Sequence, residues 1–172
     1  MNKPLKIVLT GAESTGKSTL AKSLANHFQT IWVPEYARIY IEKLNRKYTY
    51  NDVELIARKQ ISIDQNLSAG NSIVFFDTWL IITKVWFDFV YGKHPKWLDQ
   101  AIEKSDVHLF LVCDIDMQWE NDPVRENGGE NRQILHAIYL KELQKYGFNY
   151  HIVNGIGNDR LTNAIRIVEN SL

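Results

Sequence analysis

The stretch Gly11-Ala12-Glu13-Ser14-Thr15-Gly16-Lys17-Ser18 decides the fold of this chain. It follows the pattern G-x-x-x-x-G-K-S, in which glycines let the backbone form a nest of N–H groups that hold phosphate oxygens. In such a loop Lys17 reaches the β- and γ-phosphates, and the Ser18 hydroxyl is a ligand of Mg²⁺. We therefore expect ATP and Mg²⁺ as cofactors. The expected phosphate contacts are Gly11, Glu13, Ser14, Thr15, Gly16, Lys17, Ser18 and Thr19, together with Arg132 from later in the chain.

The residues on either side of this loop support the interpretation. Residues 5–10 have the apolar character of a buried strand that enters the loop. Leu20, Leu24 and Phe28 are spaced as one face of a helix that leaves it. The start of that helix would add the positive end of its dipole to the phosphate site.

Length and composition predict one domain over residues 1–172. Twenty basic residues balance twenty acidic ones, which gives no overall field to attract nucleic acid. We expect no signal peptide and no membrane-spanning run, and therefore a cytoplasmic protein with neither a nucleic-acid nor a membrane partner. Cys113 is the single cysteine, and a buried strand position suits it better than a reactive role. The oligomeric state stays open.

Four further apolar runs have the composition of strands, and helical patterns separate them. The runs are 31–33, 72–77, 107–113 and 150–153. This alternation predicts an α/β fold: a doubly wound, parallel five-stranded sheet with helices on both faces and a lid. Ligands bind such sheets at the carboxyl ends of the strands. Within one helical segment, Asn51 and Glu54 form a capping-box pattern.

Asp77 ends an apolar strand, where the second carboxylate of nucleotide-binding folds lies. It could hold Mg²⁺ through water, together with Ser18, or orient the attacking hydroxyl. The alternative is a structural role as the N-cap of a helix that begins at Thr78. The two roles are compatible.

Glu35 follows another strand directly, and Arg38 comes one helical turn later. A strand end aims such a pair at the ligand cleft. Glu35 could then be the base for an acceptor hydroxyl, with Arg38 stabilising the charge of the substrate or of the phosphoryl group. The alternative is an exposed ion pair on a helix surface.

Residues 114–132 are rich in acids, arginines, Asn and Gly and have weak periodicity. A segment of this length without regular structure is uncommon in a compact domain and is usually functional. We interpret it as a lid that closes over the phosphates, with Arg125 and Arg132 neutralising the transferring group. A solvated polar loop is the alternative.

The aromatic residues beside the strand ends are candidates for stacking on a planar ring of the substrate. They are Tyr36, Trp79 and Trp119, whereas Trp32 and Trp86 are assigned to the core. The histidines show no spacing typical of a metal site. The loop 154–158 could shape a base pocket or form a plain turn.

Three groups of residues resemble the ribosylnicotinamide kinase domain of the NadR-type family. They are the phosphate loop 11–18, the segment Val33-Pro34-Glu35-Tyr36-Ala37-Arg38, and Phe76-Asp77-Thr78-Trp79. The segment from Cys113 to Asn127, with Trp119, Asp122 and Arg125, is similar to the lid of that family. The resemblance implies a P-loop kinase that transfers the ATP γ-phosphate to the ribose 5′-hydroxyl of nicotinamide riboside. It also implies Lys17, Glu35, Asp77 and Arg125 as catalytic residues.

The longer members of that family carry an adenylyltransferase and a DNA-binding module, and we expect neither activity from this chain. Two other functions stay open. One is the same kinase chemistry on another nucleoside or nucleotide. The other is a regulatory ATPase, whose acceptor is water. A GTPase switch is disfavoured, because no Asn-Lys-x-Asp motif follows the phosphate loop.

Overall fold

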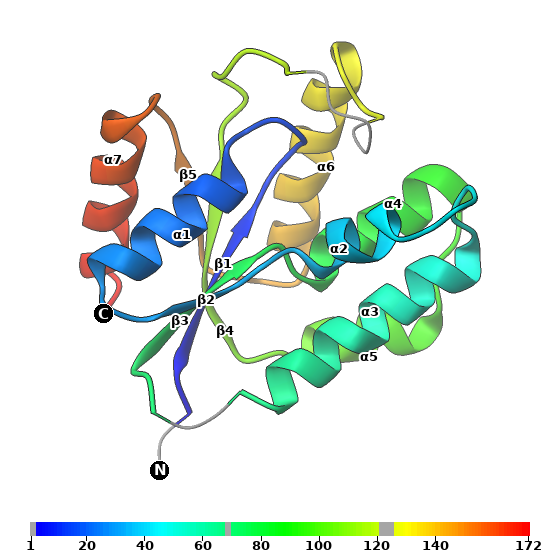
Figure 1. Ribbon diagram of the computed structural model, residues 1–172, viewed down its shortest axis with the longest axis horizontal. Helices are drawn as coiled ribbons and strands as arrows, with labels where there is room; N and C mark the ends of the chain where they lie inside the picture. The colour runs from blue at the N-terminus through cyan, green and yellow to red at the C-terminus, as the bar shows by residue number, and fades with distance from the viewer. Residues whose placement is uncertain (1–2, 68–69, 121–125) are drawn as a thin grey trace.

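The computed structural model describes residues 3–67, 70–120 and 126–172 (Figure 1). Their elements, in order, are β1 (Leu5–Thr10), α1 (Lys17–His27), β2 (Ile31–Val33), α2 (Tyr36–Glu42), α3 (Tyr50–Gln65), β3 (Ile73–Asp77), α4 (Leu80–Tyr91), α5 (Lys96–Glu103), β4 (Val107–Cys113), α6 (Glu130–Lys145), β5 (Tyr150–Val153) and α7 (Asn158–Glu169). The five strands form one parallel sheet in the order β2-β3-β1-β4-β5. The predicted α/β fold with a parallel five-stranded sheet is confirmed.

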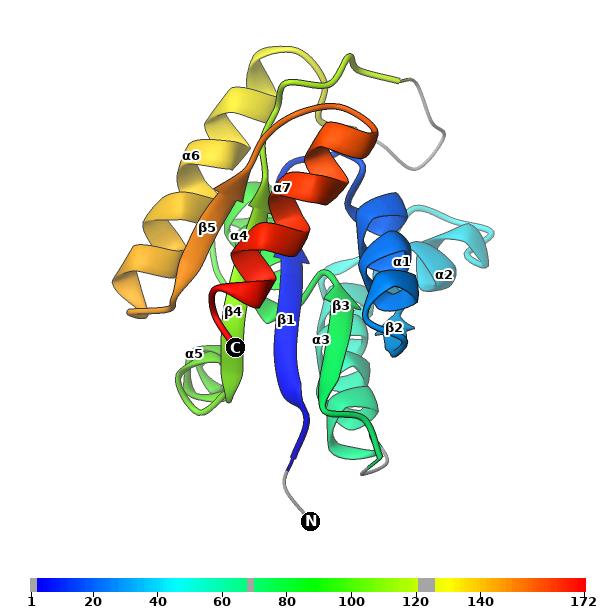
Figure 2. The ribbon, with the colours of Figure 1, turned by 90° about the vertical axis from the view of Figure 1, so that its left-hand side faces the viewer.

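The sheet is covered by helices on both faces, because alternate strand residues point to opposite sides. Val8 of β1 belongs to one core, with apolar residues of α3, α4, α5 and α6. Its neighbours Ile7 and Leu9 belong to the other core, with residues of α1 and α7. Figure 1 shows α1 and α7 on one side of the sheet, and Figure 2 faces that layer. In the described residues, no helix is long and apolar enough to cross a membrane.

The cap of α3 differs from the expected pair Asn51 and Glu54. Thr49 is the N-cap, and its backbone N–H and hydroxyl donate to the Asp52 carboxylate over 2.7 and 2.6 Å. Asp52 stands three residues after Thr49, which is the spacing that the box requires. Glu54 lies further along the helix and instead accepts from Arg58. The pattern in the sequence was therefore placed two residues too late.

The phosphate loop begins where β1 passes close to the end of β4. Gly11 has φ of 136°, and a Cβ atom there would lie 2.8 Å from the backbone oxygen of Cys113. Only glycine fits this combination of a positive φ and a close backbone approach. The start of the phosphate loop thus packs directly against the backbone of Cys113, at the buried end of β4.

Candidate active site

The phosphate loop joins β1 to α1 and is held by its own hydrogen bonds. Ser14 and Gly16 have positive φ of 58° and 73°, which turn the chain into the helix. The Thr15 hydroxyl and the Lys17 Nζ atom donate to the Ala12 carbonyl over 2.8 and 2.7 Å. The loop is therefore a preformed nest, with Lys17 as the first residue of α1.

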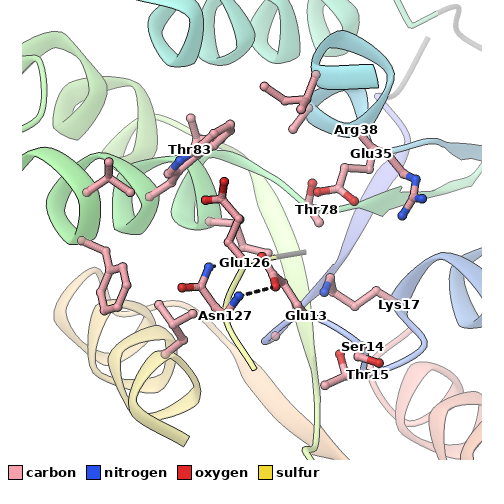
Figure 3. A pocket seen from close by; sticks show the side chains of 18 of the residues that line it. Glu13, Ser14, Thr15, Lys17, Glu35, Arg38, Thr78, Thr83, Glu126 and Asn127 are labelled. Carbon is pink, nitrogen blue, oxygen red and sulfur yellow. Dashed lines mark hydrogen bonds between the residues drawn. The ribbon is translucent and has the colours of Figure 1, made fainter. Parts of the chain in front are cut away.

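A cavity of about 730 Å³ opens from this loop. The eight phosphate-loop residues expected to contact phosphate line it, and so do Glu35 and Arg38, whereas Arg132, also expected to contact phosphate, does not. Figure 3 shows Lys17 pointing into the same space as Glu35. Away from the loop the wall becomes largely aromatic and apolar, with Tyr48, Ile82, Trp86, Phe89, Val90, Tyr91, Leu135 and Tyr139. The cavity thus joins the phosphate loop to a compartment with aromatic and apolar walls.

Glu35 is the N-cap residue of α2 and follows β2 through Pro34. Desolvation by the surrounding protein raises the pKa of its carboxyl to about 7, although the Lys17 charge lowers it. The nearby Asp77 carboxylate raises it further. A carboxyl group with a pKa close to neutrality is well placed to accept a proton from an alcohol.

Asp77 is the last residue of β3 and is 3% exposed. Desolvation raises the pKa of its carboxyl, whereas the Ser18 hydroxyl and the Glu35 backbone N–H lower it by hydrogen bonding. Its Oδ1 atom is buried, and no hydrogen bond to it occurs in the described part of the chain. Asp77 does not cap α4: Thr78 has φ of 70°, and Trp79 is the N-cap residue. The N-cap alternative is therefore wrong.

Arg38 lies on α2 and lines the cavity beside Glu35 (Figure 3). Its Nε atom donates to Glu42, four residues later, over 2.8 Å. The Arg38 charge also lowers the pKa of both Glu35 and Asp77. The residue thus has a helix-surface partner and acts electrostatically on the two carboxyl groups.

The described part of the segment 114–132 contacts the phosphate loop at several points. The Glu120 backbone N–H donates to the Ser14 hydroxyl over 2.9 Å. The Asn127 backbone N–H and side-chain amide donate to the Glu13 carboxylate over 2.9 and 3.2 Å (Figure 3). These contacts connect the segment to the loop. Arg125, expected as a catalytic residue, and Asp122 lie outside the described residues.

Arg132 lies on α6 and is 8% exposed. Its guanidinium donates to the backbone carbonyls of Ser14 and Met117, over 3.1 and 3.0 Å. The guanidinium also lies over the Trp119 ring, at 5.9 Å from the ring centre. Arg132 thus braces the phosphate loop against the segment that follows β4.

The structure distributes the expected aromatic residues differently from the sequence analysis. Trp79 is 4% exposed and packs on the Phe76 ring, with ring centres 5.5 Å apart. Trp119 lies against Gly128, and Tyr36 contacts the Tyr40 ring. Of the described residues that line the cavity, none is Tyr36, Trp79 or Trp119.

Trp86 lines the cavity, whereas Tyr36, Trp79 and Trp119 do not. It was assigned to the core, but it is half-buried, lines the cavity and meets the Tyr48 ring edge to face at 4.8 Å. The reason is that the face of α4 that carries Trp86 borders the cavity as well as the core. Hydrophobic periodicity marks an inward face but cannot distinguish a packed wall from a ligand-lined one. Trp32 is half-buried against the second core, as expected.

Arg160 is a residue that the sequence analysis missed. It lies on α7, is 2% exposed, and donates to the carbonyls of Gly155, Thr15 and Asp114 over 2.7, 2.5 and 3.2 Å. It also pairs with Asp116, which accepts from the Gly155 backbone N–H over 2.6 Å. Arg160 therefore ties the loop 154–158 to the phosphate loop. The only feature of the sequence that could have indicated this role is the position of Arg160 in the first turn of a helix that follows a strand-end loop.

The phosphate loop, the parallel sheet and the carboxyl groups at the strand ends define an enzyme of the P-loop kinase class. A family model described as an AAA domain matches residues 6–160, and the chain belongs to that family. The fold is also similar to that of solved kinases. The chain aligns with thymidylate kinase from Ehrlichia chaffeensis at a TM-score of 0.67. That alignment covers 99% of this chain and 100% of the other at 13% identity, so it supports the fold alone.

The resemblance to the NadR-type family is also confirmed. The trifunctional NAD biosynthesis/regulator protein NadR of Salmonella typhimurium is 23% identical over 171 residues, which are 95% of this chain and 42% of the relative. The protein of the same name from Escherichia coli (strain K12) is 27% identical over 84% of this chain and 37% of its own length. The chain thus spans less than half of either relative. A solved NadR protein in complex with NR has a TM-score of 0.84 and 25% identity, covering 98% of this chain and 51% of that one.

Proposed function

We propose that this chain transfers the γ-phosphate of ATP to the 5′-hydroxyl of nicotinamide riboside, which gives nicotinamide mononucleotide for NAD salvage. One observation carries the proposal: Glu35, with a pKa of about 7, borders the same cavity as the phosphate loop and an aromatic compartment. A similar NadR protein has been solved with NR, and another with NAD and AMP-PNP. We place the reaction in the cytoplasm and in a single domain over residues 1–172.

Proton removal from the acceptor hydroxyl falls to Glu35. As the hydroxyl oxygen bonds to the γ-phosphorus, the bond from that phosphorus to the β–γ bridging oxygen breaks and ADP is the leaving group. The Glu35 carboxylate accepts the hydroxyl proton, which stays on the carboxyl group until the product leaves. Its pKa near neutrality lets it be ionised in the resting enzyme and protonated after transfer. Asp77, which also lies at a strand end, is proposed to serve the metal rather than the hydroxyl.

Basic side chains of the chain are proposed to bind the phosphate groups or to position the phosphate loop. Lys17 and the backbone N–H groups of the loop hold the β- and γ-phosphates, and Arg38 offsets the charge that develops near Glu35. We propose that Arg132 positions the loop through its bonds to Ser14 rather than by lining the cavity. Arg125 remains a prediction as the lid cation of the transition state.

Mg²⁺ fits the oxygen groups at the end of β3. The Asp77 Oδ1 atom is buried and lacks a hydrogen-bond partner among the described residues, and the same carboxyl group is hydrogen-bonded by Ser18. Hard oxygen ligands of this kind suit Mg²⁺, which usually keeps several of its waters. Ser18 would hold the ion directly and Asp77 through water. When bound, the ion would neutralise charge that develops on the β- and γ-phosphates.

The aromatic compartment suits the pyridinium ring of nicotinamide riboside. Trp86 and Tyr48 line this compartment, and cation–π attraction to such a ring adds about 0.5–2 kcal/mol for a cationic ring. Carboxylates nearby, Glu35 and Glu126, favour a positively charged acceptor over a neutral one. Trp86 takes this role from the expected Tyr36, Trp79 and Trp119.

The acceptor assay tests this function. ATP·Mg²⁺ and a panel of ribosides are supplied, and ADP release and phosphorylated product are measured. We expect preferred turnover of nicotinamide riboside over adenosine, cytidine and thymidine, and near silence without an acceptor. Equal turnover of adenosine would leave a kinase for another nucleoside or nucleotide. Steady ADP release without any acceptor would favour the regulatory ATPase.

A further inference from the structure

A hydrogen-bonded polar pair lies in the cavity wall, away from the phosphate loop. Gln60 on α3 and Thr83 on α4 are 6% and 2% exposed, and both line the cavity. The Thr83 hydroxyl donates to the Gln60 Oε1 atom over 2.8 Å. Figure 3 shows Thr83 on the side of the cavity away from Lys17. Neither residue has a role in the phosphate chemistry described above.

This bond leaves the nitrogen of the Gln60 amide as the group available to a ligand. A carboxamide nitrogen carries two donors and no acceptor. Within the described residues, no hydrogen bond is made by Gln60 Nε2. Gln60 is 6% exposed and lines the cavity, so a ligand that fills this part of the cavity would exclude water from the amide nitrogen. A donor left unpaired in that way is unfavourable, so the ligand should carry an acceptor atom there.

The side chains around the Gln60–Thr83 pair are mostly apolar. Ile82, Trp86 and Val90 line the same compartment from α4. Trp86 follows Thr83 by three residues, so the two side chains lie on neighbouring parts of one helix face. In this apolar setting a hydrogen bond is electrostatically stronger than in water.

We propose that Gln60 reads the ring substituent of the acceptor, donating a hydrogen bond to an oxygen on that substituent, with Thr83 as a positioning residue. The inference rests on the proposed function and deepens it. In nicotinamide riboside the oxygen is that of the ring carboxamide. Thr83 holds the amide oxygen, so that the amide nitrogen faces the ring that lies along Trp86.

The test compares a riboside that carries the oxygen with one that lacks it. Nicotinamide riboside, nicotinic acid riboside and unsubstituted ribosylpyridinium are assayed with the wild type, Gln60→Met, Gln60→Glu, Thr83→Val and Thr83→Ser. Gln65→Met, at an exposed position on the same helix, is the matched control. Thermal melting and the KM for ATP check that each variant is folded.

We expect the wild type to prefer nicotinamide riboside over ribosylpyridinium by roughly 10- to 100-fold in kcat/KM, the effect of one buried donor left unpaired. Gln60→Met should abolish this preference, because it lowers the value for nicotinamide riboside and leaves ribosylpyridinium within about threefold. Gln60→Glu should disfavour nicotinic acid riboside most, since two carboxylates would meet. Thr83→Val should lose part of the preference, and Thr83→Ser should keep it.

A Gln60→Met variant that slows both ribosides equally would overturn the inference, because the residue would then serve packing alone. An unchanged preference in Gln60→Met would overturn it as well. If the wild type phosphorylates other nucleosides but no pyridinium riboside, the proposed function itself fails, and the inference with it. The two failures are distinguished by the wild-type assay.

Discussion

Glu35 shows at the scale of one residue how the surroundings decide chemistry. An ordinary glutamate has a pKa of 4.5 and is therefore ionised at neutral pH, but desolvation raises the pKa of Glu35 to about 7. Two consequences follow. Activity should depend on its ionisation, and the folded protein should hold the proton more tightly than the unfolded chain does.

The first prediction concerns the pH dependence of this residue. Because kcat/KM reports ionisations of the free enzyme, it should rise with pH and level off above about 7. Glu35→Gln should remove phosphoryl transfer while ATP binding, measured by calorimetry, stays intact. Weakened ATP binding in Glu35→Gln would contradict the role of base.

The same shift affects stability. The folded-state pKa lies above the unfolded value of 4.5, so the contribution of Glu35 is complete below that pH and lost as pH rises through about 7. Glu35→Gln should therefore gain stability relative to the wild type over this window. Denaturant titrations at pH 4.5 and pH 8 measure the gain.

Asp77 differs from Glu35 in its proposed partner. Asp77→Asn should raise the Mg²⁺ concentration needed for half-maximal rate and slow all acceptors alike, because the metal serves the phosphates common to every reaction. Magnesium titrations with two acceptors measure this. Selective loss with one acceptor would instead place Asp77 at the acceptor hydroxyl.

At the scale of elements, the phosphate loop depends on β1 and β4 lying side by side. Gly11→Ala would place a Cβ atom 2.8 Å from the Cys113 backbone oxygen, at a φ of 136°. Because a backbone atom cannot move aside as a flexible side chain can, we expect a loss of stability of about 1–3 kcal/mol and a large rise in the KM for ATP.

Gly70→Ala is the matched control for this substitution. A Cβ atom at Gly70 meets nothing within 4 Å, so the variant should differ little from the wild type. Thermal melts and ATP titrations of both variants check the pair. An unperturbed Gly11→Ala would show that the loop can shift away from β4 at little cost.

At the scale of the whole molecule, one cavity joins the phosphate loop to side chains of α2, α3, α4 and α6. A ligand that binds only the folded state stabilises it by about 2.7 kcal/mol at a concentration 100 times its Kd. For a chain of this size we expect ATP·Mg²⁺ to raise Tm by roughly 5–11 °C. Lys17→Ala removes a phosphate contact and one hydrogen bond to the Ala12 carbonyl but no core packing, so it should keep most of its own Tm and lose most of this shift. A full shift in Lys17→Ala would contradict the phosphate-loop assignment.

Local patterns in the sequence determined the class of this protein. The phosphate loop is a contiguous motif, and the alternation of apolar strands with helices predicts a parallel sheet whatever the details of packing. Glu35, Arg38 and Asp77 could be placed at the edge of the sheet that carries the phosphate loop, because the carboxyl ends of parallel strands meet there. Each of these inferences needs only neighbours along the chain.

Only the tertiary structure decided which side chains line the cavity. Trp79 and Trp86 stand on the same segment, yet one packs into the core and the other lines the cavity. Gln60 and Thr83 become a pair only when α3 packs on α4, and Arg160 reaches the phosphate loop only when α7 covers the sheet. The physical reason is that side-chain spacing along a helix reports burial, whereas a binding wall is made by elements that are distant in sequence.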